Sequence, residues 1–308
     1  MIIDAHTHII KQDWLPDKWW DEMSRFAEHA LKGLGVTKDV IRKDLLPTFE
    51  DPEGTTIIKE MDAAGIDKSI IFPLDYENPV GTPKASITEQ NKGYAYLQDK
   101  YPDRLIAFAS IDPRRANAFE LLEIFIKEWG MKGLKLHPSC GFYPNGKETY
   151  RLLEKASSLG VSVVIVHTGQ IVAPLYSKYC DPILLDDLLV DFPHLTIVAA
   201  HMSFGWHQQL FHMGATKLNL LTDISGWQTV AQEHYTRFCE VLREALDEFG
   251  SDRVLFGTDG PYMRAKMPDK DYVQLIKNLP GQAPEGIHFT AGEVDAILGE
   301  NAQRMLGL

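Results

Sequence analysis

Residues 161–167 read VSVVIVH and residues 195–201 read LTIVAAH, two nearly continuous apolar runs that each end in a histidine. Runs of this length are typical of strands that are covered on both faces, as the strands of a parallel sheet are. Similar runs occur from one end of the chain to the other, and stretches with helical spacing separate them. The expected strands are Ile2–His8, Lys68–Leu74, Arg104–Ile111, Met131–His137, Val161–His167, Leu195–His201, Lys217–Ser225 and Arg253–Asp259.

The regular alternation of strands and helices decides the fold class. Eight repeats indicate a closed (β/α)8 TIM barrel of the α/β class rather than an open sheet. Gly65, Gly130, Gly160 and Gly250 each close a helical stretch just before the next strand, which is the usual stop signal of a helix. We expect residues 1–308 to form one domain, because barrels of this type often exceed about 250 residues.

One long segment departs from this alternation. Residues 9–54 separate the first strand from the next regular helix, and they are too many for a plain connecting loop. We expect a helical insertion here, with a helix at Trp19–Leu34. The insertion also carries Trp14 and Trp20, so it could form an apolar cover over the mouth of the barrel.

The composition excludes several classes of partner and location. The 31 basic and 43 acidic side chains give a net charge of -12, whereas binding to nucleic acid or to an anionic membrane needs clustered Lys and Arg. No run of about 18 apolar residues is present, so the sequence predicts no membrane span. Cys140, Cys180 and Cys239 are too few and too widely spaced for a disulfide framework, which favours a reducing, cytoplasmic location.

Histidines gather at the predicted carboxyl ends of the strands. In a (β/α)8 barrel these ends form one rim, and that rim holds the active site in characterised barrel enzymes. Side chains alternate along a strand, so His6 and His8 share a face and can both point into the barrel. The strand-end residues expected to converge on the rim are His6, His8, His137, His167, His201 and Asp259.

A ring of imidazoles with one carboxylate is the donor set of a transition-metal site. Such ligands suit Zn²⁺, Mn²⁺ and Fe²⁺ better than Mg²⁺ or Ca²⁺. A single histidine at a strand end is usually a satisfied polar residue, and an HxH pair often occurs by chance. Five of the chain's 11 histidines lie at predicted strand ends. Chance explains that distribution poorly, so the pattern predicts a metal site.

Short motifs along the whole chain resemble those of a known family. The opening IDAHTH at residues 3–8 resembles the DxHxH motif of the amidohydrolase superfamily. The resemblance is closer to the amidohydrolase-related family, which contains aminocarboxymuconate-semialdehyde decarboxylase and the γ-resorcylate type of decarboxylase. The motifs that carry it are GLKLHP (133–138), VHTG (166–169), DFPHLTIVAAHMS (191–203), LFGTDGPY (255–262) and LGENAQRMLGL (298–308).

This resemblance implies a metal-dependent enzyme with a defined set of site residues. Carried over by motif, His6, His8, His167 and Asp259 are the expected ligands of one divalent transition metal, with zinc first and manganese or iron as alternatives. His201 matches a histidine that is a ligand in some members and a proton-transfer group in the decarboxylases. We therefore expect Asp259 and His201 to be the catalytic residues.

Three residues beside this set have two interpretations each. Asp4 lies on the same strand face as the histidines, and it either orients a ligand or is a buried structural carboxylate. Lys135 is either salt-bridged or, as in binuclear amidohydrolases, carbamylated to bridge two metals. His137 either binds the substrate or closes the loop after its strand.

Further candidates for substrate binding lie around the rim and in the insertion. Arg264 and Arg25 could each present a bidentate fork to a substrate carboxylate, and Trp14 and Trp20 could form an apolar wall. Each arginine could instead be an ordinary solvated residue on the surface. The tryptophans could instead serve only in local packing.

Two reactions could use the same constellation. Hydrolysis of a small carboxylated or cyclic substrate (an ester, lactone or amide) through a metal-activated water is the function ranked first. Non-oxidative decarboxylation of an aromatic or unsaturated carboxylic acid is the alternative. A non-catalytic ligand-binding barrel would show an eroded ligand set, whereas every ligand position is intact. The expected partner is a small-molecule substrate, and a homodimer is left open.

Overall fold

The computed structural model describes residues 1–308 and contains parallel strands at all eight predicted positions. They pair in the orders β1-β2-β3 and β4-β5-β6-β7-β8-β9. Only Phe108 separates β3 from β4, so these two short strands are halves of one barrel strand. The strands are β1 (Ile3–Thr7), β2 (Lys68–Ile71), β3 (Leu105–Ala107), β4 (Ala109–Ser110), β5 (Leu134–Leu136), β6 (Val163–Val166), β7 (Thr196–Ala199), β8 (Leu220–Asp223) and β9 (Val254–Leu255).

Backbone hydrogen bonds join the first strand to the last and complete the ring. The amide of Ala5 donates to the carbonyl of Phe256 over 2.8 Å, and the amide of Asp259 donates to the carbonyl of His6 over 2.8 Å. The prediction of a TIM barrel is therefore confirmed. Each strand is shorter than predicted, because sheet pairing stops before most of the polar residues at the rim. His6 in β1 and Asp223 at the end of β8 are the exceptions.

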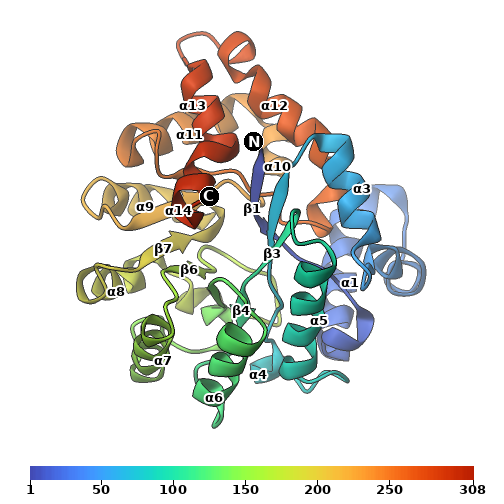
Figure 1. The fold of residues 1–308 in the computed structure, drawn as a ribbon. Helices are drawn as coiled ribbons and strands as arrows, with labels where there is room; N and C mark the ends of the chain where they lie inside the picture. Colours follow the sequence, from blue (N-terminus) through green and yellow to red (C-terminus); the bar gives the residue numbers. More distant parts are fainter.

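Helices surround the strands, as Figure 1 shows. The principal helices after the insertion are α3 (Thr55–Ala64), α5 (Ile87–Lys100), α6 (Ala118–Glu123), α7 (Lys147–Ser158), α8 (Asp186–Asp191), α9 (His207–Gly214), α11 (Tyr235–Phe249), α12 (Asp269–Gln282), α13 (Ala291–Asp295) and α14 (Asn301–Leu306), with short helices at α4 (Glu77–Val80) and α10 (Gln228–Glu233). The glycines predicted to end helices all have positive φ, from 66° to 87°. That conformation is one that glycine adopts without the clash of a Cβ atom.

Buried side chains form two separate apolar clusters. The larger cluster fills the space between strands and helices and includes Phe125, Phe211 and Leu242. The smaller cluster fills the barrel itself and includes Phe72 and Phe108. The barrel is therefore a packed core, and the histidines lie toward the carboxyl ends of its strands.

The insertion after β1 is helical, as predicted. Its main helix, α1 (Asp17–Ala30), is followed by a short 3-10 turn and by α2 (Lys38–Val40). The predicted helix at Trp19–Leu34 was placed slightly too late, since the structure begins the helix directly after Pro16 and ends it at Ala30. Proline fixes the extended backbone that precedes a first helical turn.

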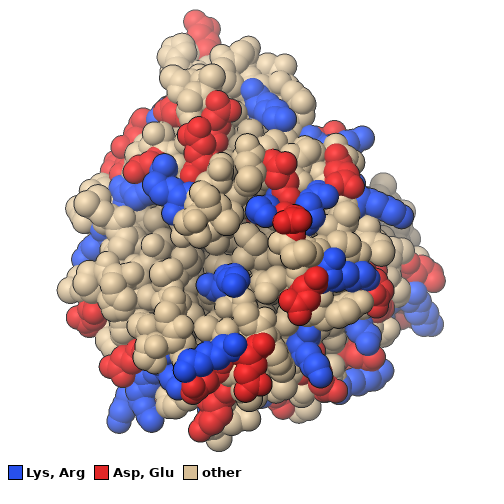
Figure 2. All heavy atoms as spheres, viewed as in Figure 1, with Lys and Arg blue, Asp and Glu red and all other residues tan.

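Charged residues of both signs are mixed on the surface, and the cysteine side chains are buried. On the face shown in Figure 2, Lys and Arg side chains lie interspersed with Asp and Glu rather than in one basic patch. No helix has both the length and the apolar character needed to cross a bilayer. Cys140, Cys180 and Cys239 are all buried free thiols.

Asp4 ties the first and last strands together. Its carboxyl group accepts hydrogen bonds from the amide of His6 (3.0 Å), from the amide of Thr258 (3.0 Å) and from the Thr258 hydroxyl (2.6 Å). Of the two interpretations of Asp4, these contacts support the structural one, because none of them reaches a histidine ring.

Replacing Thr258 with valine tests this closure. Thr258→Val keeps the shape of the side chain but removes one donor to the buried carboxyl group of Asp4. We expect the free energy of unfolding, measured by denaturant titration, to fall by about 1–3 kcal/mol. The control is Thr196→Val in β7, where the hydroxyl makes no protein hydrogen bond. Equal losses in the two variants would contradict the role given to Asp4.

Candidate active site

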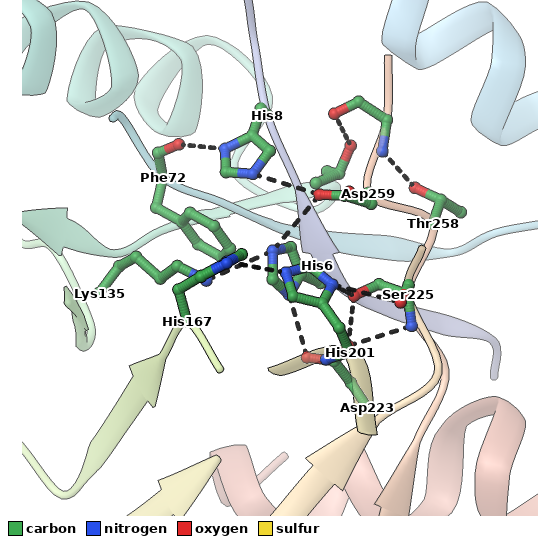
Figure 3. A network of polar contacts seen from close by, with 12 residues as sticks. His6, His8, Phe72, Lys135, His167, His201, Asp223, Ser225, Thr258 and Asp259 are labelled. Atoms are coloured by element: carbon green, nitrogen blue, oxygen red, sulfur yellow. Dashed lines mark hydrogen bonds and ion pairs between the residues drawn. The ribbon is translucent and has the colours of Figure 1, made fainter. Parts of the chain in front are cut away.

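The polar residues predicted at the strand ends meet at the carboxyl rim of the barrel (Figure 3). The rings form a continuous series, with centroids 5.4 Å apart for His6 and His8, 4.6 Å for His6 and His201, 4.8 Å for His201 and His167, and 5.4 Å for His167 and His137. These residues are far apart in the sequence, but the parallel strands place all of them at one edge of the barrel.

Asp259 faces the two histidines of β1. Its Oδ1 atom lies 3.6 Å from Nε2 of His6 and 3.5 Å from Nε2 of His8. His6, His201 and Asp259 each offer a ligand atom, and these three atoms lie within 4.8 Å of one another. Such spacing leaves room for a small cation between the donor atoms.

The remaining ring nitrogens of the β1 histidines are already engaged. Nδ1 of His6 lies 3.0 Å from Oδ2 of Asp223, and Nδ1 of His8 lies 3.1 Å from the carbonyl oxygen of Phe72. Both partners are acceptors, so Nδ1 of each ring is the donor in these contacts, and Nε2 is the atom that faces Asp259. Histidines that bind metals are oriented in this way by their outer partners.

His201 and His167 extend the ring on the opposite side. Nε2 of His201 lies 3.1 Å from Nδ1 of His167, while Nε2 of His167 is buried and has no partner. Both ring nitrogens of His137 are also buried without a partner. Buried polar atoms without hydrogen bonds are rare in native proteins, and they commonly mark a bound ligand, ion or water.

Burial favours the neutral form of four rings in this series, those of His6, His137, His167 and His201. Burial, reinforced by nearby Lys135, lowers the pKa of His6 to about 3 and that of His137 well below the ordinary value. It also lowers the pKa of His167 and of His201. Neutral imidazole is the form that coordinates a metal, so no proton has to be displaced before an ion binds.

Asp259 remains charged in the same surroundings. Burial by itself would raise the pKa of its carboxyl group, but the attraction of His201 and the contact with His8 outweigh burial and hold the pKa below the usual range. The site therefore presents one negative oxygen among neutral nitrogens. That combination attracts a divalent cation.

Asp223 is a site residue that the sequence analysis missed. It ends β8, inside the predicted strand Lys217–Ser225, so the rule that selected the strand-end histidines could also have selected it. Besides the ring of His6, its carboxylate accepts the amide of His201 (3.1 Å) and the amide of Ser225 (3.0 Å). Burial would raise its pKa, yet the contact with His6 outweighs that effect and the pKa lies below the usual range.

Lys135 points into the barrel beneath this ring. Its Nζ atom lies 3.4 Å from Nε2 of His6 and 4.6 Å from the centroid of the Phe72 ring. The side chain is fully buried, and burial lowers its pKa to about 8. It makes no ion pair with a carboxylate, so the salt-bridged interpretation is wrong. Carbamylation stays a prediction.

Comparison with known proteins identifies the family. Residues 3–308 match the family model described as amidohydrolase. The chain belongs to the amidohydrolase family. No curated protein matches its sequence.

Solved structures confirm the fold of this amidohydrolase. An uncharacterised TIM-barrel protein from Bordetella bronchiseptica is 22% identical, with a TM-score of 0.67 over 99% of this chain and 98% of that chain. The 5-carboxyvanillate decarboxylase of Sphingomonas paucimobilis is 16% identical, with a TM-score of 0.67 over 100% and 99%. A dihydroxybenzoic acid decarboxylase from Polaromonas, bound to manganese and 2-nitroresorcinol, is 17% identical, with a TM-score of 0.65 over 100% and 97%.

The other predicted substrate contacts of the amidohydrolase have protein partners. Trp14 packs on Tyr94 with centroids 5.3 Å apart, and the buried indole of Trp20 donates to the carbonyl of Gln12 over 3.1 Å. Arg264 pairs with Asp269 over 3.1 Å. These contacts support packing and ion-pair roles, and a contact with substrate stays a prediction for each residue. The same holds for the exposed Arg25, which pairs with Glu22.

An aromatic wall formed by Trp19, Tyr76 and Tyr262 stands beside the ring of histidines. Tyr76 meets His137 edge-on at 5.1 Å, and Trp19 lies 6.4 Å from Tyr76 and 5.5 Å from Tyr262. The hydroxyl of Tyr262 is buried without a partner. The sequence analysis missed Tyr76 and Tyr262, and placed Trp19 only in the insertion, because their meeting depends on how α1 and the segments after β2 and β9 pack together.

Asparagine at position 223 should weaken metal binding by the amidohydrolase. Asp223→Asn keeps the shape of the side chain but removes the charge that orients the ring of His6. We expect the affinity for Zn²⁺ or Mn²⁺, measured by competition with a chelator, to fall about 10- to 100-fold. Asp187→Asn, an exposed position on α8, is the control. Unchanged affinity in a folded Asp223→Asn protein would show that His6 does not depend on this contact.

Proposed function

We propose that this amidohydrolase is a metal-dependent, non-oxidative decarboxylase that removes CO₂ from an aromatic carboxylic acid. The observation that carries the proposal is the aromatic wall beside a ring of metal-type donors. Decarboxylases of hydroxylated benzoic acids among the similar structures support it further. The sequence analysis ranked hydrolysis first, and the comparisons favour its alternative instead.

The donor atoms on the rim suit one divalent transition metal. We assign His6, His8, His167 and Asp259 as its ligands, with His201 within reach of the same position. Nitrogen and carboxylate donors suit zinc, manganese and iron alike, and manganese is present in three of the similar decarboxylase structures. When bound, the ion supplies a positive charge that holds and polarises the substrate carboxylate.

Asp259 and His201 are the residues placed to handle the proton. In the overall reaction the bond between the ring carbon and the carboxylate breaks, CO₂ leaves, and a proton takes its place on that carbon. Nδ1 of His201 lies 2.8 Å from Oγ of Ser225, so Nε2 is the ring nitrogen that faces the site. Positioned proton transfer of this kind contributes about 10²- to 10⁴-fold to a rate.

The aromatic wall would bind the ring of the substrate and exclude water. Trp19 comes from the insertion, so the insertion contributes directly to this wall. Flat apolar faces pack against an aromatic substrate at little cost in side-chain entropy. The buried hydroxyl of Tyr262 and the free nitrogens of His137 remain available for polar substituents.

A screen for CO₂ release tests the proposed reaction. The protein, loaded with Mn²⁺ or Zn²⁺, is offered 2,6-dihydroxybenzoate and 5-carboxyvanillate, and CO₂ and the decarboxylated ring are measured. A parallel panel of esters and lactones tests hydrolysis. We expect about one metal ion per chain and CO₂ release, and His6→Ala/His8→Ala should stay folded while losing both. Ester or lactone cleavage without CO₂ release would sink the proposal, and so would full metal content in the double variant.

Removing the hydroxyl of Tyr262 separates binding from folding. That hydroxyl has no protein partner, so Tyr262→Phe should leave the free energy of unfolding unchanged within about 0.5 kcal/mol. If the hydroxyl bonds the substrate, KM should rise about 3- to 10-fold. In the contrasting variant Tyr272→Phe, the lost hydroxyl donates to the carbonyl of Ile224 over 2.8 Å, so stability should fall by about 1–2 kcal/mol. An unaltered KM in Tyr262→Phe would exclude the substrate contact.

A further inference from the structure

The turn that carries His201 has an unusual backbone. His201, Met202 and Ser203 are consecutive non-glycine residues with φ of 63°, 43° and 50°, in the left-handed region. Side chains with a Cβ atom rarely adopt this region, and such conformations persist only where surrounding contacts impose them. Some part of the molecule must therefore hold this turn against its own preference.

The last residue of β8 and the loop after it supply those contacts. The carboxylate of Asp223 accepts the amide of His201 over 3.1 Å, and Oγ of Ser225 lies 2.8 Å from Nδ1 of its ring. Nε1 of Trp227 donates to the carbonyl of His201 over 2.6 Å. One short segment thus holds the amide, the ring and the carbonyl of a single residue.

Trp227 is itself firmly placed. Its side chain is 3% exposed and packs edge-on against Phe204 at 5.2 Å and against His207 at 5.8 Å. Its carbonyl accepts the amide of Ala231, which fixes the residue at the start of α10. The indole therefore offers a rigid donor, and an indole N–H can only donate.

We propose that Trp227 is the positioning residue that keeps His201 in the left-handed turn and so keeps Nε2 of His201 facing the site. The inference rests on the proposed function, in which His201 moves a proton. Without the indole donor, the carbonyl of His201 keeps only the amide of Phe204 at 3.1 Å, a contact inside the same turn. The turn would then relax toward the ordinary region, and Nε2 would leave its place beside His167.

The first test replaces Trp227 with phenylalanine, which keeps an aromatic ring but lacks the donor. Crystal structures of the metal-loaded wild type and variant are compared at residues 201–203. We expect φ of His201 to turn negative in Trp227→Phe and Nε2 of His201 to move away from His167. A left-handed turn with His201 unmoved would overturn the proposal. This comparison needs no substrate, so it tests the positioning role of Trp227 even if the proposed reaction is wrong.

Kinetics distinguish a positioning role from a packing role. With 2,6-dihydroxybenzoate, kcat should fall about 10- to 100-fold in Trp227→Phe, because displacement of a catalytic group by about 1 Å has effects of that size. KM and metal content should stay within about twofold of the wild type. Trp129→Phe is the control, since Trp129 stacks on Phe125 away from the site. A rise in KM or a loss of metal with kcat unchanged would overturn the proposal.

A glycine at position 203 provides a rescue. Glycine adopts positive φ without strain, so Ser203→Gly should reduce the need for the indole donor. When Ser203→Gly is added to Trp227→Phe, kcat should recover at least about a third of its loss on a logarithmic scale. Ser203→Gly alone should have the kcat of the wild type. If Trp227→Phe acts by disturbed packing, the glycine would recover nothing, and that result would refute the positioning role.

Discussion

The carboxylate of Asp223 is the contact on which the arrangement of the site depends. One oxygen engages the ring of His6, which belongs to the first strand, and the other accepts the amide of His201, which follows β7. Because Nδ1 of His6 is occupied, Nε2 is left to face Asp259. A single buried charge thus sets the tautomer of one histidine and the backbone path of another. Hydrogen bonds that involve a charged group are roughly twice as strong as neutral ones, so this contact can oppose a strained turn.

Much of the fold could be predicted because the strands of a barrel are buried on both faces. Apolar runs such as Val163–Val166 and Thr196–Ala199 are then nearly continuous and easy to locate. The ends of these strands are harder to locate, since pairing stops where the chain turns to present a polar side chain at the rim. The prediction of His6, His167 and Asp259 on one edge followed from parallel pairing alone. Asp223 obeys the same rule, but the predicted strand ran on to Ser225, so Asp223 did not stand at its expected end.

The aromatic wall could not be predicted in the same way. Trp19, Tyr76 and Tyr262 follow no common periodicity, since they lie on α1, after β2 and after β9. Their meeting depends on how the insertion folds back over the rim, which is a matter of tertiary packing. Trp14 and Trp20 were the more obvious candidates in the sequence, yet both are engaged with residues of the insertion and of α5. The rim therefore has polar strand ends on one side and the aromatic wall on the other. The proposed decarboxylation of an aromatic acid would use that division, with the ring against the wall and the carboxylate toward the histidines.

The position of the metal ion is the central claim, and anomalous X-ray diffraction tests it most directly. Crystals soaked in Mn²⁺ are measured at the manganese absorption edge. We expect one strong peak per chain, bounded by Nε2 of His6, Nε2 of His8 and the carboxylate of Asp259. A peak held by other residues, or no peak at this rim in fully soaked crystals, would contradict it.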